Sequence, residues 1–339
     1  MNKTSFFRFF TILLLGVSFQ TFGQYTEVIN SNNPGFSESP YSVGSGIYQF
    51  ETNLFFRSTG IVPKFTRPQS LGADLMFRTS FLSERLELNA HMSYSRDKVA
   101  FNNVFTSTRF ETGLNRFTVA AKYLVFQQEY EDKSKEVRSW KRRNAFDKKR
   151  LIPSVAVYAG INTDFVGEFY QTGGISPKVG VLLQNDLSNQ FNIVTNVFYD
   201  FIGTDAEEIS YIITGTISLS DRWSTFFENQ TIFQKTRNLS NFGTGLAFLY
   251  NRDLQLNTSA RYLTEGASKG IYVGFGVSYR INRHQDESYE VDEYGNRIEE
   301  TPITKYNKKK GGFFSRMFNI FKKKDKKKKK RTRKRPKRN

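Results

Sequence analysis

Residues 86–94 read Leu-Glu-Leu-Asn-Ala-His-Met-Ser-Tyr, an alternation in which even-numbered side chains are apolar or aromatic and odd-numbered ones are polar. Successive side chains of an extended strand point to opposite faces of a sheet. The stretch therefore predicts a β-strand with one apolar and one polar face. Its length is close to the ~9–11 residues that a tilted strand needs to cross the hydrocarbon core of a membrane.

The same two-residue period recurs along most of the chain. The apolar faces of these runs carry no Asp, Glu, Lys or Arg, whereas the opposite faces carry many. One run, at 223–234, is weaker because Phe226 and Ile232 interrupt its polar face. Twelve runs follow the pattern, at 48–57, 70–81, 86–94, 117–125, 155–164, 178–186, 191–201, 208–219, 223–234, 241–250, 254–262 and 271–280.

Alternation alone does not distinguish a membrane barrel from a soluble β-sandwich, since both have one apolar face. The length of the runs, their even number and connections that alternate between short and long all favour the barrel. Every backbone polar group in lipid must be satisfied within the protein, so a sheet in a membrane has to close on itself. The sequence thus predicts an all-β fold, a transmembrane antiparallel up-and-down β-barrel of about twelve strands.

Tight turns fall near 82–84, 188–189, 220–221 and 251–252, and longer polar connections alternate with them. An even strand number places both ends of the barrel, and these turns, on the periplasmic side. The stretch 128–150 is long and of mixed charge, which predicts a charged periplasmic loop. Aromatic residues near the run ends predict girdles at the two membrane surfaces; they are Tyr48, Tyr94, Tyr123, Tyr199, Trp223, Tyr250, Tyr262 and Tyr279.

The N-terminus has the features of an export signal. Lys3 and Arg8 precede an apolar stretch, and small residues lie three and one positions before a cut after Gly23. The chain is therefore expected in the outer membrane of a Gram-negative cell. The predicted segments are a signal peptide at 1–23, an N-terminal periplasmic or plug segment at 24–45, the barrel at 46–281, an acidic linker at 282–304 and an amphipathic, polybasic tail at 305–339.

The tail carries the charge of the protein. Residues 305–339 hold 19 Lys and Arg residues and one acid, Asp325, which accounts for the net charge of +18 of the whole chain. Apolar residues before the basic run recur on one helical face, and this combination is typical of segments that bind anionic surfaces. The residues expected to bind such a surface are Phe313, Phe314, Phe318, Phe321, Lys322, Lys326, Lys330, Arg331 and Arg335.

The expected partners are outer-membrane lipid and, through the periplasmic tail, an anionic polymer or an acidic protein. A solvated tail without a fixed partner is the alternative. Nucleic acid would also bind a basic run, but the export signal argues against that partner. The sequence makes no prediction of the oligomeric state.

The polar faces of the runs are expected to line the lumen. They carry acids and bases in nearly equal numbers, so steep ion selectivity is not predicted. These charges either pair across a narrow lumen as a structural network or line a polar path for small solutes. The predicted lumen-lining residues are Glu51, Arg57, Asp74, Arg78, Glu87, His91, Lys122, Asp164, Lys178, Asp186, Asp200, Glu228, Arg261 and Arg280.

Catalysis, metal binding and cofactors are not predicted. The chain has no Cys and 2 His, His91 and His284, which are far apart. A thiolate nucleophile and a His-based metal cluster are therefore excluded, and a Ser-His-Asp triad lacks a suitable His. No Gly-rich phosphate loop follows a strand and opens a helix.

Residues 33–40, which read Asn-Pro-Gly-Phe-Ser-Glu-Ser-Pro, and the later motifs Asp186-Leu187-Ser188 and Leu219-Ser220-Asp221-Arg222-Trp223 carry a resemblance. They are similar to a bacterial outer-membrane transporter family related to the outer-membrane protein of a meta-pathway of phenol degradation. The Phe-rich signal with Gln24 after the cut is similar to exported proteins of Bacteroidetes-type bacteria. The family resemblance runs from about residue 33 to 281 and implies the passage of small molecules, apolar ones included.

The sequence is therefore compatible with two functions. The first is an outer-membrane β-barrel that acts as a transporter or channel for small solutes, with a periplasmic basic tail for anionic surfaces or partners. The second is a non-transporting structural or assembly subunit of an outer-membrane complex, anchored by the barrel.

Overall fold

The computed structural model describes residues 28–59, 69–98, 109–128, 147–235, 238–265 and 268–283. In these residues the chain forms twelve β-strands and two short 3₁₀ helices, η2 (Lys148–Leu151) and η3 (Glu168–Tyr170), and no helix is long and apolar enough to cross a membrane. The strands are β1 (Ile47–Thr59), β2 (Gln69–Ser83), β3 (Leu86–Lys98), β4 (Phe110–Phe126), β5 (Ser154–Asn162), β6 (Ser176–Asn185), β7 (Phe191–Asp200), β8 (Glu208–Ser218), β9 (Trp223–Gln234), β10 (Asn238–Asn251), β11 (Leu254–Glu265) and β12 (Ser268–Asn282).

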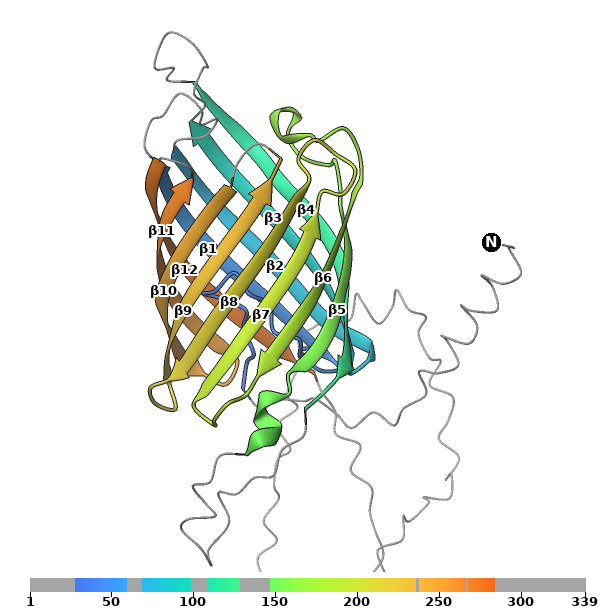
Figure 1. The fold of residues 1–339 in the computed structure, drawn as a ribbon, viewed down its shortest axis with the longest axis vertical. Helices are drawn as coiled ribbons and strands as arrows, with labels where there is room; N and C mark the ends of the chain where they lie inside the picture. Colours follow the sequence, from blue (N-terminus) through green and yellow to red (C-terminus); the bar gives the residue numbers. More distant parts are fainter. Residues whose placement is uncertain are drawn as a thin grey trace, which may run out of the picture. The chain divides into compact units, whose positions relative to one another are not determined.

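Each strand pairs antiparallel with its neighbours in the chain, and β1 also pairs with β12, so that the sheet closes into a barrel (Figure 1). The closing pair runs from Ile47 opposite Asn282 to Thr59 opposite Gly270. Closure leaves no free strand edge, which is the condition for a sheet to span lipid. The predicted twelve-stranded up-and-down barrel is confirmed.

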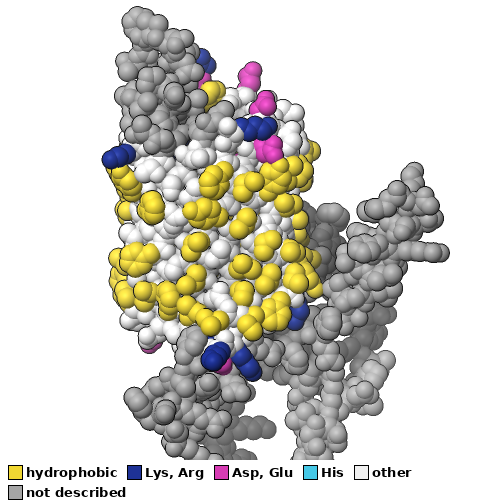
Figure 2. All heavy atoms as spheres, viewed as in Figure 1, with side chains coloured by type: hydrophobic (Ala, Val, Ile, Leu, Met, Phe, Trp, Pro, Cys, Tyr) yellow, Lys and Arg dark blue, Asp and Glu magenta, His cyan; other side chains and the backbone are white. Residues whose placement is uncertain are grey.

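The outer face of the barrel is apolar. Leu54, Phe227 and Phe275 each expose 60% or more of their surface. Figure 2 shows hydrophobic side chains spread over the height of the wall, with charged side chains confined to its two ends. A water-soluble monomer rarely exposes so continuous an apolar surface, so this wall contacts lipid. Several of the predicted girdle aromatics are exposed on it, namely Tyr94, Trp223, Tyr250, Tyr262 and Tyr279.

Strand β9 corrects the interpretation of the irregular run at 223–234. Phe226 is 4% exposed and its neighbour Phe227 is 60% exposed, so the two rings point to opposite faces. Ile232 lines a cavity inside the barrel. The alternation of β9 is intact, and Phe226 and Ile232 are not breaks in it, because the inner face accepts apolar as well as polar side chains.

The two ends of the barrel differ. The chain enters β1 and leaves β12 at the end where β6–β7, β8–β9 and β10–β11 are joined by tight turns, which we call the turn end. At the opposite end, the loop end, the connection 163–175 contains η3, and Tyr170 ties it to β3 by donating to Asp97 Oδ2 at 3.0 Å. The tight turns and the two chain ends of the barrel therefore share one side.

Several predicted segments lie outside the described residues. They are the signal peptide, residues 129–146 of the charged loop, the acidic linker from residue 284 onward, and the whole tail with its expected anionic-surface residues from Phe313 to Arg335.

Candidate functional site

Residues Val28–Ser45, which we call the lumen segment, run inside the barrel, where they form the blue trace in its lower half (Figure 1). At the turn end the segment begins with a hydrogen bond from Ile29 N to Arg252 O of 2.9 Å. It returns to the same end, where Gly46 N donates to Ser80 O at 3.0 Å before β1 starts. Between these points its polar backbone groups meet side chains from the inner faces of many strands.

Four charged side chains on the neighbouring strands β1–β4 form one network, the charged cluster of Glu51, Arg78, Glu87 and Lys122. Arg78 lies 2.9 Å from a carboxylate oxygen of Glu51 and of Glu87, and Lys122 lies 3.0 Å from Glu87. All four side chains are 1% exposed or less. Burial of charges is tolerated when each is paired and hydrogen-bonded, and this cluster balances two acids with two bases.

The charged cluster also holds the backbone of the lumen segment. Its bases donate to carbonyl oxygens of the segment, and its acids accept from N–H groups of the segment. The contacts are Arg78 Nη1 to Asn30 O at 2.9 Å, Lys122 Nζ to Ser39 O at 2.8 Å, Asn32 N to Glu51 Oε2 at 3.0 Å, Asn33 N to Glu51 Oε2 at 3.1 Å and Val43 N to Glu87 Oε2 at 3.0 Å.

A second ion pair holds the middle of the segment. Arg261 Nη2 on β11 lies 3.1 Å from Glu228 Oε1 on β9, and both side chains are 1% exposed. The other oxygen of Glu228 accepts from Phe36 N at 2.8 Å and from Ser37 N at 3.3 Å. Arg261 donates to Pro34 O at 2.8 Å, and its guanidinium carbon lies 3.6 Å from the centroid of the Phe36 ring. This part of the segment is therefore clamped by both members of the pair.

Asn196 on β7 binds the backbone of Glu38 twice, accepting from Glu38 N at 2.7 Å and donating to Glu38 O at 2.9 Å. The Glu38 side chain is buried, and its Oε2 has no hydrogen-bond partner among the described residues. Burial raises the pKa of the Glu38 carboxyl, even though Lys122 and Lys178 oppose the shift. The docked segment thus favours the neutral form of this acid.

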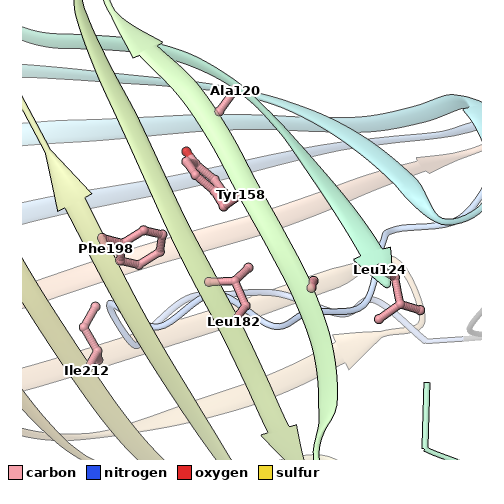
Figure 3. Packing of buried hydrophobic residues seen from close by; sticks show 7 residues of the cluster. Ala120, Leu124, Tyr158, Leu182, Phe198 and Ile212 are labelled. Carbon is pink, nitrogen blue, oxygen red and sulfur yellow. The ribbon is translucent and has the colours of Figure 1, made fainter. Parts of the chain in front are cut away.

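Another part of the inner face is apolar (Figure 3). Here side chains from β4 to β8 pack together, with the rings of Tyr158 and Phe198 meeting edge to face at 5.4 Å. Phe36 and Tyr41 of the lumen segment pack against this surface. We call it the apolar wall, and it consists of Ala120, Leu124, Ala156, Tyr158, Leu182, Phe198 and Ile212.

The lumen segment separates two cavities. A cavity of about 410 Å³ reaches Thr59 and Leu239 toward the loop end, and one of about 160 Å³ reaches Asn192 and Ser224 toward the turn end. We call them the loop-end cavity and the turn-end cavity. The residues that line both are Asn32, Asn33, Pro34, Gly35 and Ser37.

The structure places the predicted lumen-lining residues in five different settings. Glu51, Arg78, Glu87 and Lys122 form the charged cluster, and Glu228 pairs with Arg261. Arg280 pairs with Asp253 at 2.8 Å near the turn end. Asp164 and Asp186 lie just beyond the ends of β5 and β6. The remaining ones line the loop-end cavity together with Glu51, and they are Arg57, Asp74, His91, Lys178 and Asp200.

The sequence pattern missed other residues of the site. Arg116 lines the loop-end cavity and lies 3.5 Å from Asp200 and 3.9 Å from Glu208. Arg116 lies on the same inner face as Thr118 and Lys122, so the alternation extends back to it, and the predicted run at 117–125 began one residue too late. The bulge at Asn115, which shifts the register between β3 and β4, comes only after Arg116 on the way to the loop end. Among the described residues no group of three or more His, Asp or Glu side chains is arranged to hold a metal ion.

Comparisons with known proteins identify the kind of barrel. A family model described as "Putative MetA-pathway of phenol degradation" matches residues 31–281. A comparison with curated protein sequences gives no match. Among solved structures, an outer membrane channel from Pseudomonas putida F1 is 9% identical, with a TM-score of 0.51 and coverage of 75% of this chain and 100% of that chain. At this identity the likeness concerns the fold.

Two further solved structures are more distant. The CymD monoaromatic hydrocarbon channel is 9% identical, with a TM-score of 0.43 and coverage of 71% of this chain and 89% of that chain. The toluene transporter TbuX of Ralstonia pickettii is 11% identical, with a TM-score of 0.37 and coverage of 71% of this chain and 90% of that chain.

Proposed function

The chain belongs to the family described as the putative MetA pathway of phenol degradation, and we propose that it is an outer-membrane channel for small solutes that its lumen segment holds closed. The observation that carries the proposal is the pair of cavities, one toward each end, which meet at the same five residues of the segment. The solved channel from Pseudomonas putida F1, which has the same kind of fold, supports it.

Opening needs only a local movement in this proposal. A displacement of residues 32–37 joins the two cavities, because this short stretch is what they share. The Glu228–Arg261 pair is the main contact that keeps Pro34 and Phe36 in place. The rest of the segment stays bound to the charged cluster, so the gate moves without loss of the whole segment from the bore.

We place the turn end in the periplasm and the loop end at the cell surface, because tight turns and both barrel termini of outer-membrane barrels face the periplasm. A solute then meets the loop-end cavity first. In this orientation the basic tail, which lies outside the described residues, belongs to the periplasm. We assign it to an anionic surface there, either a polymer or an acidic protein.

Conductance across planar bilayers tests the channel. The wild-type protein is expected to be mostly closed with discrete openings, and Glu228→Ala is expected to be open for most of the record. Asp253→Ala is the matched control, because it breaks an ion pair, Arg280–Asp253, that does not contact residues 32–37. If neither the wild type nor Glu228→Ala conducts at any voltage, the channel proposal is wrong.

The buried and charge-balanced bore also suits the second candidate, a structural or assembly subunit that never opens. This candidate predicts that deletion of residues 305–339 removes co-purifying partners while the barrel stays folded. A silent Glu228→Ala barrel together with such a loss would favour it. Unchanged partners after the deletion would contradict it.

A further inference from the structure

The loop-end cavity has two chemically different sides. On the arc formed by β9, β11, β12 and β1, it is lined by Ile232, Leu263, Tyr272 and Phe55. Tyr272 stacks on Phe55 with 5.5 Å between ring centroids and meets Phe36 of the lumen segment edge to face at 5.6 Å. We call this surface the apolar arc. It offers hydrocarbon and ring surface to whatever occupies the cavity, with polar side chains such as Asn53, Gln230 and Asn241 from the same part of the barrel between the apolar ones.

The opposite side, from β2 to β7, carries most of the charged side chains of the lining, next to the apolar Met76 and Phe198. We call it the polar arc, and it consists of Asp74, His91, Arg116, Lys178 and Asp200. Its charges have fixed partners, since Lys178 lies 3.4 Å and Arg116 3.5 Å from Asp200. Asp74 is within hydrogen-bonding reach of Ser93 and Asn53. The polar arc therefore presents two acidic and two basic side chains close to one another, so that neither charge is in excess.

This pairing decides the charge of a suitable ligand. An anion on the polar arc would meet Asp74 and Asp200, and a cation would meet Arg116 and Lys178. Either ion would leave water without a compensating counter-charge, which is unfavourable inside a protein. Hydroxyl and carbonyl groups avoid that penalty, because they can use donors and acceptors of the arc without a net charge.

We propose that the loop-end cavity binds one uncharged amphiphilic molecule, with its hydrocarbon part on the apolar arc and its hydroxyl or carbonyl groups on the polar arc. The volume of about 410 Å³ lies within the range of small-molecule sites. The inference rests on the proposed function in that the cavity lies on the proposed solute path. Binding itself does not require the gate to open.

The test uses four probes of similar size in titrations followed by saturation-transfer NMR, with the full-length protein in micelles and protein-free micelles as the blank. Cyclohexanol is the uncharged amphiphile. Cyclohexylamine and cyclohexanecarboxylate carry the same ring with a positive or a negative charge, and myo-inositol is polar all round. We expect cyclohexanol to bind at least about tenfold more tightly than each of the others. A charged analogue or inositol that binds as tightly as cyclohexanol would overturn the proposal.

Two variants locate the site. Ile232→Asn places a polar group on the apolar arc and should weaken cyclohexanol binding about tenfold. The matched control is Val194→Asn, which changes a buried apolar residue of the turn-end cavity and should leave binding unchanged. Equal weakening by both variants, or no weakening by Ile232→Asn, contradicts the assignment.

Heat-modifiable migration on a gel shows whether each variant is folded. If Ile232→Asn does not fold, the variant Asp74→Asn tests the proposed binding site instead. Loss of that negative charge should raise the affinity for cyclohexanecarboxylate several-fold and keep cyclohexanol binding, whereas an unchanged anion affinity overturns the proposal. If cyclohexanol binds but the protein does not conduct, the channel proposal is wrong and the proposed binding site stands. If the protein conducts but does not bind cyclohexanol, the proposed binding site is wrong and the channel proposal stands.

Discussion

The charged cluster and the apolar wall occupy different parts of the same inner face and hold the lumen segment by different means. The cluster, on β1–β4, donates to and accepts from the backbone of the segment at defined atoms. The wall, on β4–β8, packs against the rings of Phe36 and Tyr41. The charged cluster thus binds the segment by hydrogen bonds and the apolar wall by apolar contact, with Asn196 on β7 adding two hydrogen bonds beside the wall.

The two kinds of contact should affect different properties of the lumen segment, its position in the bore and the stability of its docked state. Hydrogen bonds require a particular distance and angle, so the cluster and the Glu228–Arg261 pair fix where the segment lies. Apolar burial is non-directional and scales with area, so the wall stabilises the docked segment without selecting one exact path. Changes that remove hydrogen bonds to the segment should therefore alter gating, and changes on the apolar wall should alter the free energy of unfolding without opening the channel. Removal of a charge from the buried cluster should also lower the free energy of unfolding, because its partners stay buried.

The largest effect is expected for Arg78→Met. This change leaves Glu51 and Glu87 buried with Lys122 as the only base of the cluster. Removal of one partner from a buried ion pair destabilises by about 3–5 kcal/mol. A urea titration of the protein in lipid vesicles, followed by tryptophan fluorescence, measures the loss in the free energy of unfolding.

Arg280→Met is the control for Arg78→Met. Arg280 is also a buried inward-facing base, but its partner Asp253 is 43% exposed and stays hydrated when the base is removed. We expect a loss of about 1 kcal/mol. Equal losses in the two variants would show that the charged cluster stabilises the folded barrel no more than the Arg280–Asp253 pair does.

Leu182→Ala should have the next largest effect, on stability alone. Leu182 is completely buried in the apolar wall, and truncation of such a side chain costs about 2–5 kcal/mol. No hydrogen bond of the lumen segment is lost, so the open fraction in planar bilayers should stay at the wild-type level. If Leu182→Ala opens the channel as Glu228→Ala is expected to, the distinction between the two surfaces is wrong.

Asn196→Ala should loosen the segment without unfolding the barrel. It removes both hydrogen bonds to the backbone of Glu38, and we expect a loss of about 1–2 kcal/mol in docking of the segment. Because the chain has no Cys, Ser37→Cys supplies a single thiol as a reporter on the segment. Modification of that thiol by a water-soluble maleimide should be about tenfold faster in Asn196→Ala. An unchanged rate would mean that Asn196 does not hold the segment.

The outer face of the barrel was predictable because lipid sets one requirement for it. Leu54, Phe227 and Phe275 all lie on faces that the alternation marked as apolar. Most positions that contact hydrocarbon are apolar, so the pattern along a single strand is sufficient to find the outer face.

The inner face obeys no such single requirement. Phe55, Phe198 and Phe226 point inward as the acids and bases do, since a bore that is filled by its own chain can bury either kind. Which charges meet depends on the stagger of the strands, and a bulge such as that at Asn115 changes the stagger. Glu228 on β9 and Arg261 on β11, for example, meet across Gly243 of β10. The lumen segment has no periodicity, and its contacts reach residues up to 247 positions away, as between the hydroxyls of Ser31 and Ser278.

The smallest effect is expected from Glu38, and it concerns pH. Burial raises the pKa of its carboxyl above the ordinary 4.5 in the docked segment, where Lys122, Lys178, Arg78 and Glu87 surround it. A raised pKa in the docked state means that docking is most stable when the acid is protonated, and that this stability falls as the pH rises through the raised value. The open fraction should therefore increase from acidic pH upward.

Glu38→Gln tests this assignment, because the neutral amide keeps the size of the side chain and cannot ionise. The backbone contacts of residue 38 with Asn196 remain available in the variant, so the segment should still dock. Planar-bilayer records over a pH series should then show a flatter dependence of the open fraction than in the wild type. If the open fraction of Glu38→Gln depends on pH as steeply as that of the wild type, another group causes the response. If the open fraction of the wild type falls as the pH rises, the direction derived from burial is wrong.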